Sequence, residues 1–426
     1  METATAASTS APISNIPAPK TVESLGVRRN VLEELALKIL YMSVELTLRE
    51  LSHRMRVSLS VIQEIFGAMR KGLLVEIKGI SEGTYLITPT SEGKARALEL
   101  LSLNHYVGPA PVSLSDYVER VRSQSVRNFA VQPAEVERAF RHLVLNRQMM
   151  NQLGTALVSG TSIVLYGSTG TGKSSVAEAI PEVYHDRVWV PYAVEIDSQI
   201  ITVFDPTVHR QVEQPATEEE TDERWVLCRR PRVTVGGELT IDMLDLQFHP
   251  VSKFYVAPVQ MKANNGALII DDFGRQRMRP EELLNRWTVP LDRSVDFLTL
   301  VGGRKIDVPF DLFVIFATNL DPAKLADEAF LRRIHNKIKV DFMEREQFKE
   351  IFRRLCDQFG LAYESSVVDA LVETLTRELK QPLRACYPLD IIQQIRWAAQ
   401  YQGVAPRLDR DTIAQACRNY FLAPKA

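Results

Sequence analysis

The chain has few cysteines, no long apolar run and no secretory signal. Its four cysteines stand far apart in 426 residues, without a Cys-x-x-Cys pair. This excludes a disulfide framework and a cysteine-ligated zinc site, and it is typical of reduced thiols in a cytoplasm. No stretch of about 18 apolar residues is present, so we expect no membrane insertion. The first residues lack the layout of a signal peptide, and we therefore predict a cytoplasmic protein.

The sequence also lacks a basic excess. Its 51 Lys and Arg residues stand against 53 Asp and Glu residues, for a formal net charge of −2. A chain that is basic overall is thereby excluded, and any nucleic-acid contact must come from a local patch. The length suffices for two or three domains, each with its own core.

What the sequence does contain is a glycine-rich turn between an apolar run and a helical pattern. The segment TSIVLYGSTGTGKSSVAEAI (161–180) predicts a strand, a phosphate-binding loop and a helix. Glycines let backbone N–H groups point inward, and the helix N-terminus adds partial positive charge. Lys173 can then reach the β- and γ-phosphates, and the Ser174 hydroxyl can ligate Mg²⁺. The predicted nucleotide-binding residues are Gly167, Ser168, Thr169, Gly170, Thr171, Gly172, Lys173, Ser174 and Ser175.

Polar side chains follow two further apolar runs. GALII (266–270) ends in Asp271 and Asp272, and LFVIFATN ends at Asn319. A carboxylate at the carboxyl end of a strand beside the P-loop is placed to bind Mg²⁺, so we assign Asp271 to the metal, directly or through water. Asp272 would polarise the attacking water. The Asn319 amide would orient that water or sense the γ-phosphate.

The remaining chain divides by composition and periodicity. We expect a disordered tail (1–26), a winged-helix domain (27–103), a linker (104–132), an α/β ATPase domain (133–342) and a helical lid (343–426). Residues 27–103 carry 11 Lys and Arg against 9 Asp and Glu. Because duplex affinity comes largely from phosphate neutralisation, this thin surplus leaves DNA binding and protein docking both open for the winged helix.

The order of parts over about 130–422 resembles an AAA+ ATPase. The matching parts are the P-loop, a Walker B run (IIDD), a hairpin (VGGRKIDV), a sensor-1 strand (FATN), an arginine pair and a helical lid. The hairpin before ATN is similar to the enhancer-activator, MoxR and magnesium-chelatase groups. The longer string FYVAPVQMKANNGALIIDDFGRQRMRPEELLNRW resembles bacterial predicted chaperone-like ATPases associated with Flp pilus assembly.

The resemblance implies an ATP- and Mg²⁺-dependent hydrolase acting as a ring, expected to be hexameric, that remodels a protein partner. Asn319 would be sensor 1, and Arg332 or Arg333 would act on the ATP of a neighbouring subunit. Such an arginine is worth about 10³–10⁵ in rate in the best-studied cases. The alternatives are a DNA-associated regulator tethered by the winged helix and a slow, nucleotide-gated scaffold.

Two departures from the pattern bear on the rate of hydrolysis. The Walker B run ends in Asp271-Asp272 where Asp-Glu is usual, and aspartate is one methylene shorter. The usual Pro-Arg-Asp of the lid reads Pro388-Leu389-Asp390, which makes Arg384 the nearest substitute for sensor 2.

Overall fold

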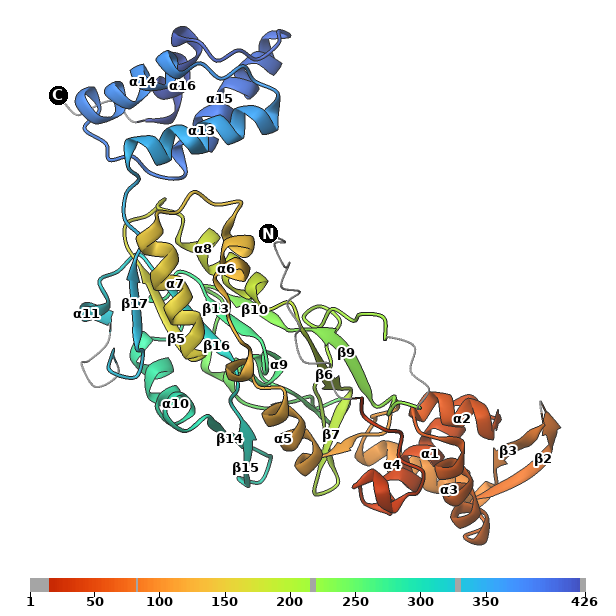
Figure 1. Cartoon of the computed structure of the whole chain (residues 1–426). Helices are drawn as coiled ribbons and strands as arrows, with labels where there is room; N and C mark the ends of the chain where they lie inside the picture. Colours follow the sequence, from red (N-terminus) through yellow and green to blue (C-terminus); the bar gives the residue numbers. More distant parts are fainter. Residues whose placement is uncertain (1–14, 82, 215–219, 326–330, 422–426) are drawn as a thin grey trace, which may run out of the picture.

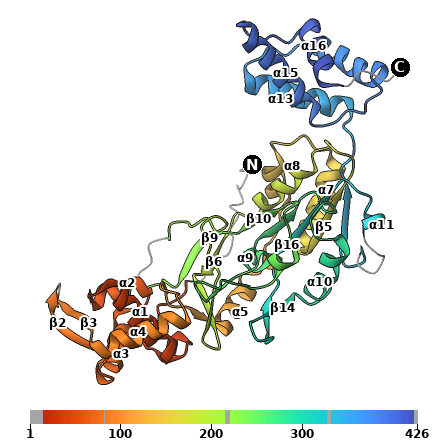
Figure 2. The ribbon, with the colours of Figure 1, turned by 180° about the vertical axis from the view of Figure 1, so that it is seen from behind.

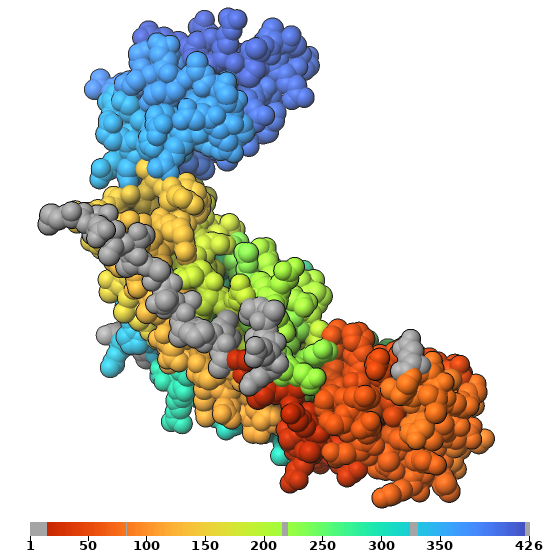
Figure 3. Space-filling view, turned by 45° about the vertical axis from the view of Figure 1, so that its right-hand side comes forward, coloured from red at the N-terminus to blue at the C-terminus, as the bar shows by residue number. Residues whose placement is uncertain are grey.

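The computed structural model describes residues 15–81, 83–214, 220–325 and 331–421. Figures 1 and 2 show three bodies in a row: an N-terminal helical unit, a central α/β body and a C-terminal helical unit. The space-filling view shows that the molecule is elongated, with the C-terminal unit at one end and the N-terminal unit at the other (Figure 3).

A five-stranded parallel sheet forms the heart of the central body. Its order is β10 (Arg232–Val235), β13 (Ala267–Ile270), β16 (Phe313–Thr318), β5 (Ser162–Tyr166) and β17 (Asn336–Lys339). The strands are short apolar runs, as expected where both faces of a parallel sheet are covered. Strand β16 lies between β5 and β13, so the acid-ended strand is not the direct neighbour of the P-loop strand.

Alternating side chains of β5 reach two different cores. Ile163 and Leu165 pack with helices α6 (Pro133–Phe140), α7 (Arg147–Ser159) and α8 (Lys173–Ala179). Val164 faces the opposite core, which contains Trp287 of α10 (Pro280–Arg293). This is the period of two that a strand imposes. Both faces of the strand are therefore covered by apolar side chains.

The segment 198–260 and the chain around it fold into further sheets. A second five-stranded sheet has the order β11 (Gln247–Phe248), β12 (Tyr255–Val256), β8 (Gln199–Thr202), β7 (Ala193–Ile196) and β4 (Val112–Ser113). A ribbon pairs β6 (Arg187–Pro191) with β9 (Trp225–Arg229), and a hairpin pairs β14 (Val295–Thr299) with β15 (Lys305–Pro309). These elements share one apolar core. Strands of the 198–260 segment therefore have a packing role.

The N-terminal unit contains α1 (Arg29–Ser43), β1 (Leu46–Thr47), α2 (Leu48–Met55), α3 (Leu59–Lys71), β2 (Val75–Ser81), β3 (Thr84–Pro89) and α4 (Ser91–Leu103). A capping box joins Thr47 and Glu50 at the start of α2, with each side chain accepting from the other residue's backbone N–H. The three short strands form a sheet of order β1-β3-β2. Figure 1 shows β2 and β3 projecting away from the central body.

The boundaries of two predicted segments need correction. Within the predicted tail, Val22 and Leu25 are buried in the core of the N-terminal unit, where they pack with apolar residues of α1–α4. Residues 1–14 lie outside the described residues. The predicted linker is also structured: β4 pairs with β7, and Tyr117 and Val121 of α5 (Leu114–Ser123) are buried in the second core.

The C-terminal unit consists of α13 (Arg345–Phe359), α14 (Ser365–Glu373), the π-helical turn η5 (Thr374–Glu378), α15 (Tyr387–Gln402) and α16 (Arg410–Tyr420). They surround a core of their own that includes Phe348 and Phe352. Across the part of the chain that the structure describes, no helix is both long and apolar enough to span a bilayer.

Candidate nucleotide site

The glycine-rich loop joins β5 to α8 in a backbone that requires glycine. Gly167 has φ 144°, and a Cβ built there would lie 2.3 Å from the carbonyl oxygen of Val340. Gly170 and Gly172 also have positive φ values of 78° and 96°. Only glycine adopts these conformations without strain. The turn can therefore bring successive N–H groups to one point, which is the geometry that binds phosphate.

Lys173 opens α8 and is folded back over this loop. Its side chain is buried, and its Nζ donates a hydrogen bond of 2.7 Å to the carbonyl oxygen of Ser168. The Thr171 hydroxyl donates to the same oxygen at 2.9 Å. Burial lowers the pKa of Lys173, and the nearby Asp272 and Asp271 carboxylates oppose this shift. An ammonium has three donors, so two remain for phosphate oxygens.

The other predicted loop residues lie at its surface. Ser168 and Thr169 are exposed at the tip of the loop, and Ser175 is exposed in the first turn of α8. Their exposure leaves this part of the loop accessible to a ligand.

Ser174 and Asp271 come together although they are 97 residues apart. The Ser174 hydroxyl donates to Asp271 Oδ1 at 3.1 Å. Mg²⁺ prefers oxygen ligands and is usually held by one or two carboxylates together with substrate phosphates. This pair fits such an ion. Among the described residues no cluster of three or more His, Cys, Asp or Glu could hold a metal alone, so the phosphates would complete the coordination.

Asp272 and Asn319 form a second contact at the same edge. The Asn319 Nδ2 group donates to Asp272 Oδ1 at 2.9 Å, and the Asp272 N–H donates to Asp271 Oδ1 at 2.9 Å. Asp272 has φ 48°, a left-handed conformation that aspartate tolerates better than most residues. The backbone therefore offers a reason for aspartate at this position. The shorter carboxylate already reaches the predicted sensor amide.

Gln276 is a site residue that the sequence reasoning missed. Its Nε2 donates to the carbonyl oxygens of Asp271 at 2.9 Å and Asp272 at 3.2 Å, while its Oε1 accepts from the Gly274 N–H at 2.7 Å. Gln276 thus stabilises the turn that carries Asp271 and Asp272 and fixes the position of their carboxylates. The available signal was a polar residue a few positions after the acidic pair, inside a glycine-containing turn.

The two arginines of the predicted pair differ in their surroundings. Arg333 makes an ion pair with Asp292 of α10, with Nε and Oδ2 at 2.8 Å. Arg332 is exposed, and its side chain makes no hydrogen bond or ion pair with any described residue. The first is held within its own chain. The second is available to another molecule.

Arg384 reaches the P-loop from the C-terminal unit. The Cys386 N–H donates to the Gly170 carbonyl at 3.2 Å, and the Arg384 side chain lies next to Gly170. The Arg384 guanidinium lies over the Tyr387 ring, 5.7 Å from its centroid, and its Nε is buried without a partner among the described residues. The position predicted as a substitute for sensor 2 is thus beside the loop, whereas Leu389 is a residue of α15 further along the chain.

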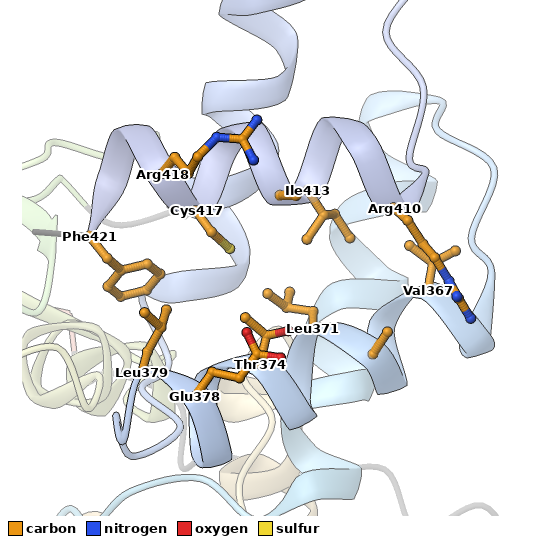
Figure 4. A pocket seen from close by; sticks show the side chains of 12 residues that line it. Val367, Leu371, Thr374, Glu378, Leu379, Arg410, Ile413, Cys417, Arg418 and Phe421 are labelled. Carbon is orange, nitrogen blue, oxygen red and sulfur yellow. The ribbon is translucent and has the colours of Figure 1, made fainter. Parts of the chain in front are cut away.

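A separate groove lies within the C-terminal unit, between α14–η5 and α16 (Figure 4). Its volume is about 560 Å³. Apolar side chains such as Leu371, Ile413 and Phe421 line much of it. Its lining includes neither glycine nor lysine.

The strand, loop and helix, together with the acid-ended strand of the same parallel sheet, form a P-loop arrangement in an α/β fold. Residues 344–419 match a family model described as a domain of unknown function, DUF8689. No curated protein matches the chain.

The solved structures that resemble the chain include RuvB proteins of Thermotoga maritima. A point mutant of RuvB is 14% identical, with a TM-score of 0.37 over 70% of this chain and 72% of that one. The structure titled Holliday junction branch migration motor is 14% identical, with a TM-score of 0.37 over 65% and 69%. The P-loop arrangement described above therefore rests on the strands and the loop of this chain itself.

Proposed function

We propose that this protein binds ATP with Mg²⁺, hydrolyses it, and works as an oligomeric ring that remodels a protein partner. The observation that carries the proposal is the meeting of Ser174 and Asp271 beside Lys173, with Asp272 and Asn319 paired at the same edge. These groups come from the carboxyl ends of β13 and β16 and from the first turn of α8. Their meeting beside one glycine-rich loop supports a common role in binding a nucleotide.

Each residue then has a role that follows from its position. Lys173 and the loop N–H groups bind the phosphates, and Ser174 and Asp271 hold Mg²⁺, which would neutralise charge that develops during phosphoryl transfer. Asp272 accepts a proton from, or polarises, the attacking water. Asn319 keeps that carboxylate oriented through the 2.9 Å hydrogen bond. Arg384 supplies positive charge from the C-terminal unit.

The ring is supported by the arginine pair. Arg333 is engaged with Asp292, so we assign Arg332 as the residue that reaches the ATP of a neighbouring subunit. A guanidinium that completes a site in trans would make hydrolysis depend on assembly. This is a specific role for an exposed cation in the segment that precedes β17.

The β14–β15 hairpin is a candidate contact for the remodelled protein. Its base is anchored, because the buried Asp296 carboxylate pairs with Arg286 and accepts from Gln260 Nε2 at 2.9 Å. Its turn is exposed, with Val301 69% accessible beside Gly302 and Gly303. Figure 1 shows the hairpin extending from the central body. A rigid base with an apolar tip suits contact with another polypeptide.

The N-terminal unit is interpreted as a winged helix that docks protein. Three helices followed by the β2–β3 ribbon support this arrangement. The α3 surface that would read DNA is engaged by the chain's own N-terminal segment: Ser60 Oγ donates to the Lys20 carbonyl at 2.7 Å, and the Val22 N–H donates to Glu64 at 3.4 Å. These contacts favour protein docking over the alternative of a DNA-tethered regulator.

The ring is tested by measuring molar mass in solution. With Mg²⁺ and a non-hydrolysable ATP analogue, we expect light scattering after size exclusion to report a mass several times that of one chain. Arg407→Gln, an exposed change in the C-terminal unit, serves as a control and should assemble normally. A chain that stays monomeric with ATP analogue, with ADP and without nucleotide would rule out the ring.

The slow-scaffold alternative is tested by Asp272→Glu. Because Asp272 already contacts Asn319 in a left-handed backbone that suits aspartate, we expect turnover to stay within about threefold of the wild type. Steady-state ATPase assays give the answer. A gain of more than about tenfold would mean that the native aspartate restrains hydrolysis, and would favour the scaffold.

A further inference from the structure

A polar cleft lies at the amino ends of the sheet strands, opposite the carboxyl ends from which the nucleotide loop extends. Its volume is about 480 Å³, within the range of small-molecule sites. It opens where α8 has ended: η3 (Ile180–Val183) and the residues after it form one wall. At a rise of about 1.5 Å per helical residue, Tyr184 lies on the order of 15 Å from Lys173 along the helix axis, so the cleft is separate from the P-loop. We call this hollow the arginine cleft, lined by Arg138, Glu182, Tyr184, His185, Asp186, Arg187, Arg210, Arg229, Arg230 and Arg232 among others.

The charge of the arginine cleft is unbalanced. Six arginines line it against two carboxylates, a surplus of four positive charges in a chain whose net charge is −2. Arg230 is neutralised, since its guanidinium makes two 2.6 Å bonds to Asp186 and also donates to the carbonyls of Gln124 and Asn265. Arg232 lies 3.5 Å from Glu182. These two arginines form the fixed wall of the cleft.

Three further arginines, Arg187, Arg210 and Arg229, are close in the fold, and no carboxylate of a described residue pairs with them. Arg187 and Arg229 are directly opposite in the β6–β9 ribbon, and the Arg229 N–H donates to the Arg210 carbonyl at 3.0 Å. Like charges opposite each other destabilise a strand pair. Among the residues that the structure describes, neither Arg210 nor Arg229 pairs with a carboxylate, and Arg187 has one 3.5 Å contact, to the Glu213 carbonyl. A bound anion would relieve this repulsion.

Tyr184 provides an independent sign of a ligand. Its side chain lines the cleft and is 7% exposed, yet its hydroxyl has no hydrogen-bond partner in the described chain. Burial raises the pKa of Tyr184, which keeps the hydroxyl protonated and able to donate. The ring is held edge-on by Phe129, with centroids 5.2 Å apart. A buried, unpaired hydroxyl costs about 1–3 kcal/mol, which a hydrogen bond to a ligand would recover.

We propose that the arginine cleft binds a small phosphate-bearing anion, of the size of pyrophosphate or the phosphate chain of a nucleotide, separately from the ATP of the P-loop. Planar guanidiniums match phosphate oxygens in pairs, and Arg187, Arg210 and Arg229 are the groups free to do so. Tyr184 donates the additional hydrogen bond. Arg232 is paired with Ala267, the first residue of β13, whereas Asp271 follows the last residue of that strand. The arginine cleft therefore lies at the amino ends of the strands, opposite the P-loop.

Calorimetric titration with inorganic pyrophosphate in EDTA tests the proposal on the full chain carrying Lys173→Ala, so that neither the P-loop lysine nor Mg²⁺ contributes. Adding Arg210→Gln with Arg229→Gln should weaken pyrophosphate binding by at least about tenfold, because two charge-assisted hydrogen bonds are lost. Arg407→Gln is the matched control and should change nothing. Absence of binding to the parent chain, or binding unaffected by the double change, would overturn the proposal.

Two further arms separate the cleft from general electrostatics. Tyr184→Phe should weaken pyrophosphate binding several-fold while raising the melting temperature of the free protein, because an unpaired buried hydroxyl is removed. A change that leaves affinity intact would contradict the ligand contact. Single-stranded DNA is titrated in parallel: binding of the oligonucleotide without binding of pyrophosphate would refute a small-anion site in favour of a nucleic-acid groove.

Discussion

Replacing Lys173 by alanine is expected to lower ATP turnover by at least about 10²–10³, the cost typical of removing one preorganised donor from a transition state. Lys173 is buried over the loop, where its Nζ donates to the Ser168 carbonyl, and alanine has no donor to offer the phosphates from that position. Phosphate release under saturating ATP and Mg²⁺ measures the effect.

Lys337 of the central sheet provides a matched control for Lys173→Ala. Lys337 of β17 also donates its Nζ to a backbone carbonyl, that of Ile334 at 2.6 Å, but it lies outside the loop. Lys337→Ala should keep near-normal turnover. If Lys173→Ala hydrolysed ATP at the wild-type rate, the assignment of this loop as the catalytic nucleotide site would be wrong.

Replacing Arg332 by alanine should have an effect of similar or larger size while leaving nucleotide binding intact. The expected loss is about 10³ in turnover, the lower end of the range for arginines that act on a neighbouring nucleotide. Arg333→Ala is the internal comparison. Because Arg333 pairs with Asp292, its loss should act mainly on stability, and Asp292→Asn should reproduce it.

Mixing two inactive variants tests whether Arg332 acts in trans. Lys173→Ala has a disabled loop and an intact Arg332, and Arg332→Ala has the reverse. In a randomly mixed ring, a site is active when its own loop and its neighbour's arginine are both intact, which gives roughly a quarter of wild-type turnover. Arg332→Ala subunits that regain nothing from the mixture would place Arg332 outside the neighbour's site.

The local parts of the site could be predicted from the sequence. The loop from Gly167 to Ser174 is a contiguous pattern in which glycine conformations and a helix start decide the shape. The strands that end at Asp271 and Asn319 are apolar runs with polar ends. Such signals depend on neighbours within a few residues, so a single sequence contains them.

Other features depended on segments that are far apart in the chain. The sequence of the tail carries no signal that Leu25 is buried, because its packing partners come from α1–α4. The position of β16 between β5 and β13 is a matter of sheet order, which strand patterns leave undetermined. Arg332 and Arg333 are equivalent in the sequence, and only the position of Asp292 on α10 separates them.

The sequence alone thus predicted a phosphate loop and the residues that we propose as ligands of phosphate and Mg²⁺, because these predictions depend on residue type at short spacing. The tertiary structure decided that Ser174 meets Asp271, that Gln276 holds the acidic turn and that the arginines around Tyr184 gather in one cleft. The physical reason is the same in each case. Hydrogen bonds and unbalanced charges act through space, and chain folding sets the distances over which they act.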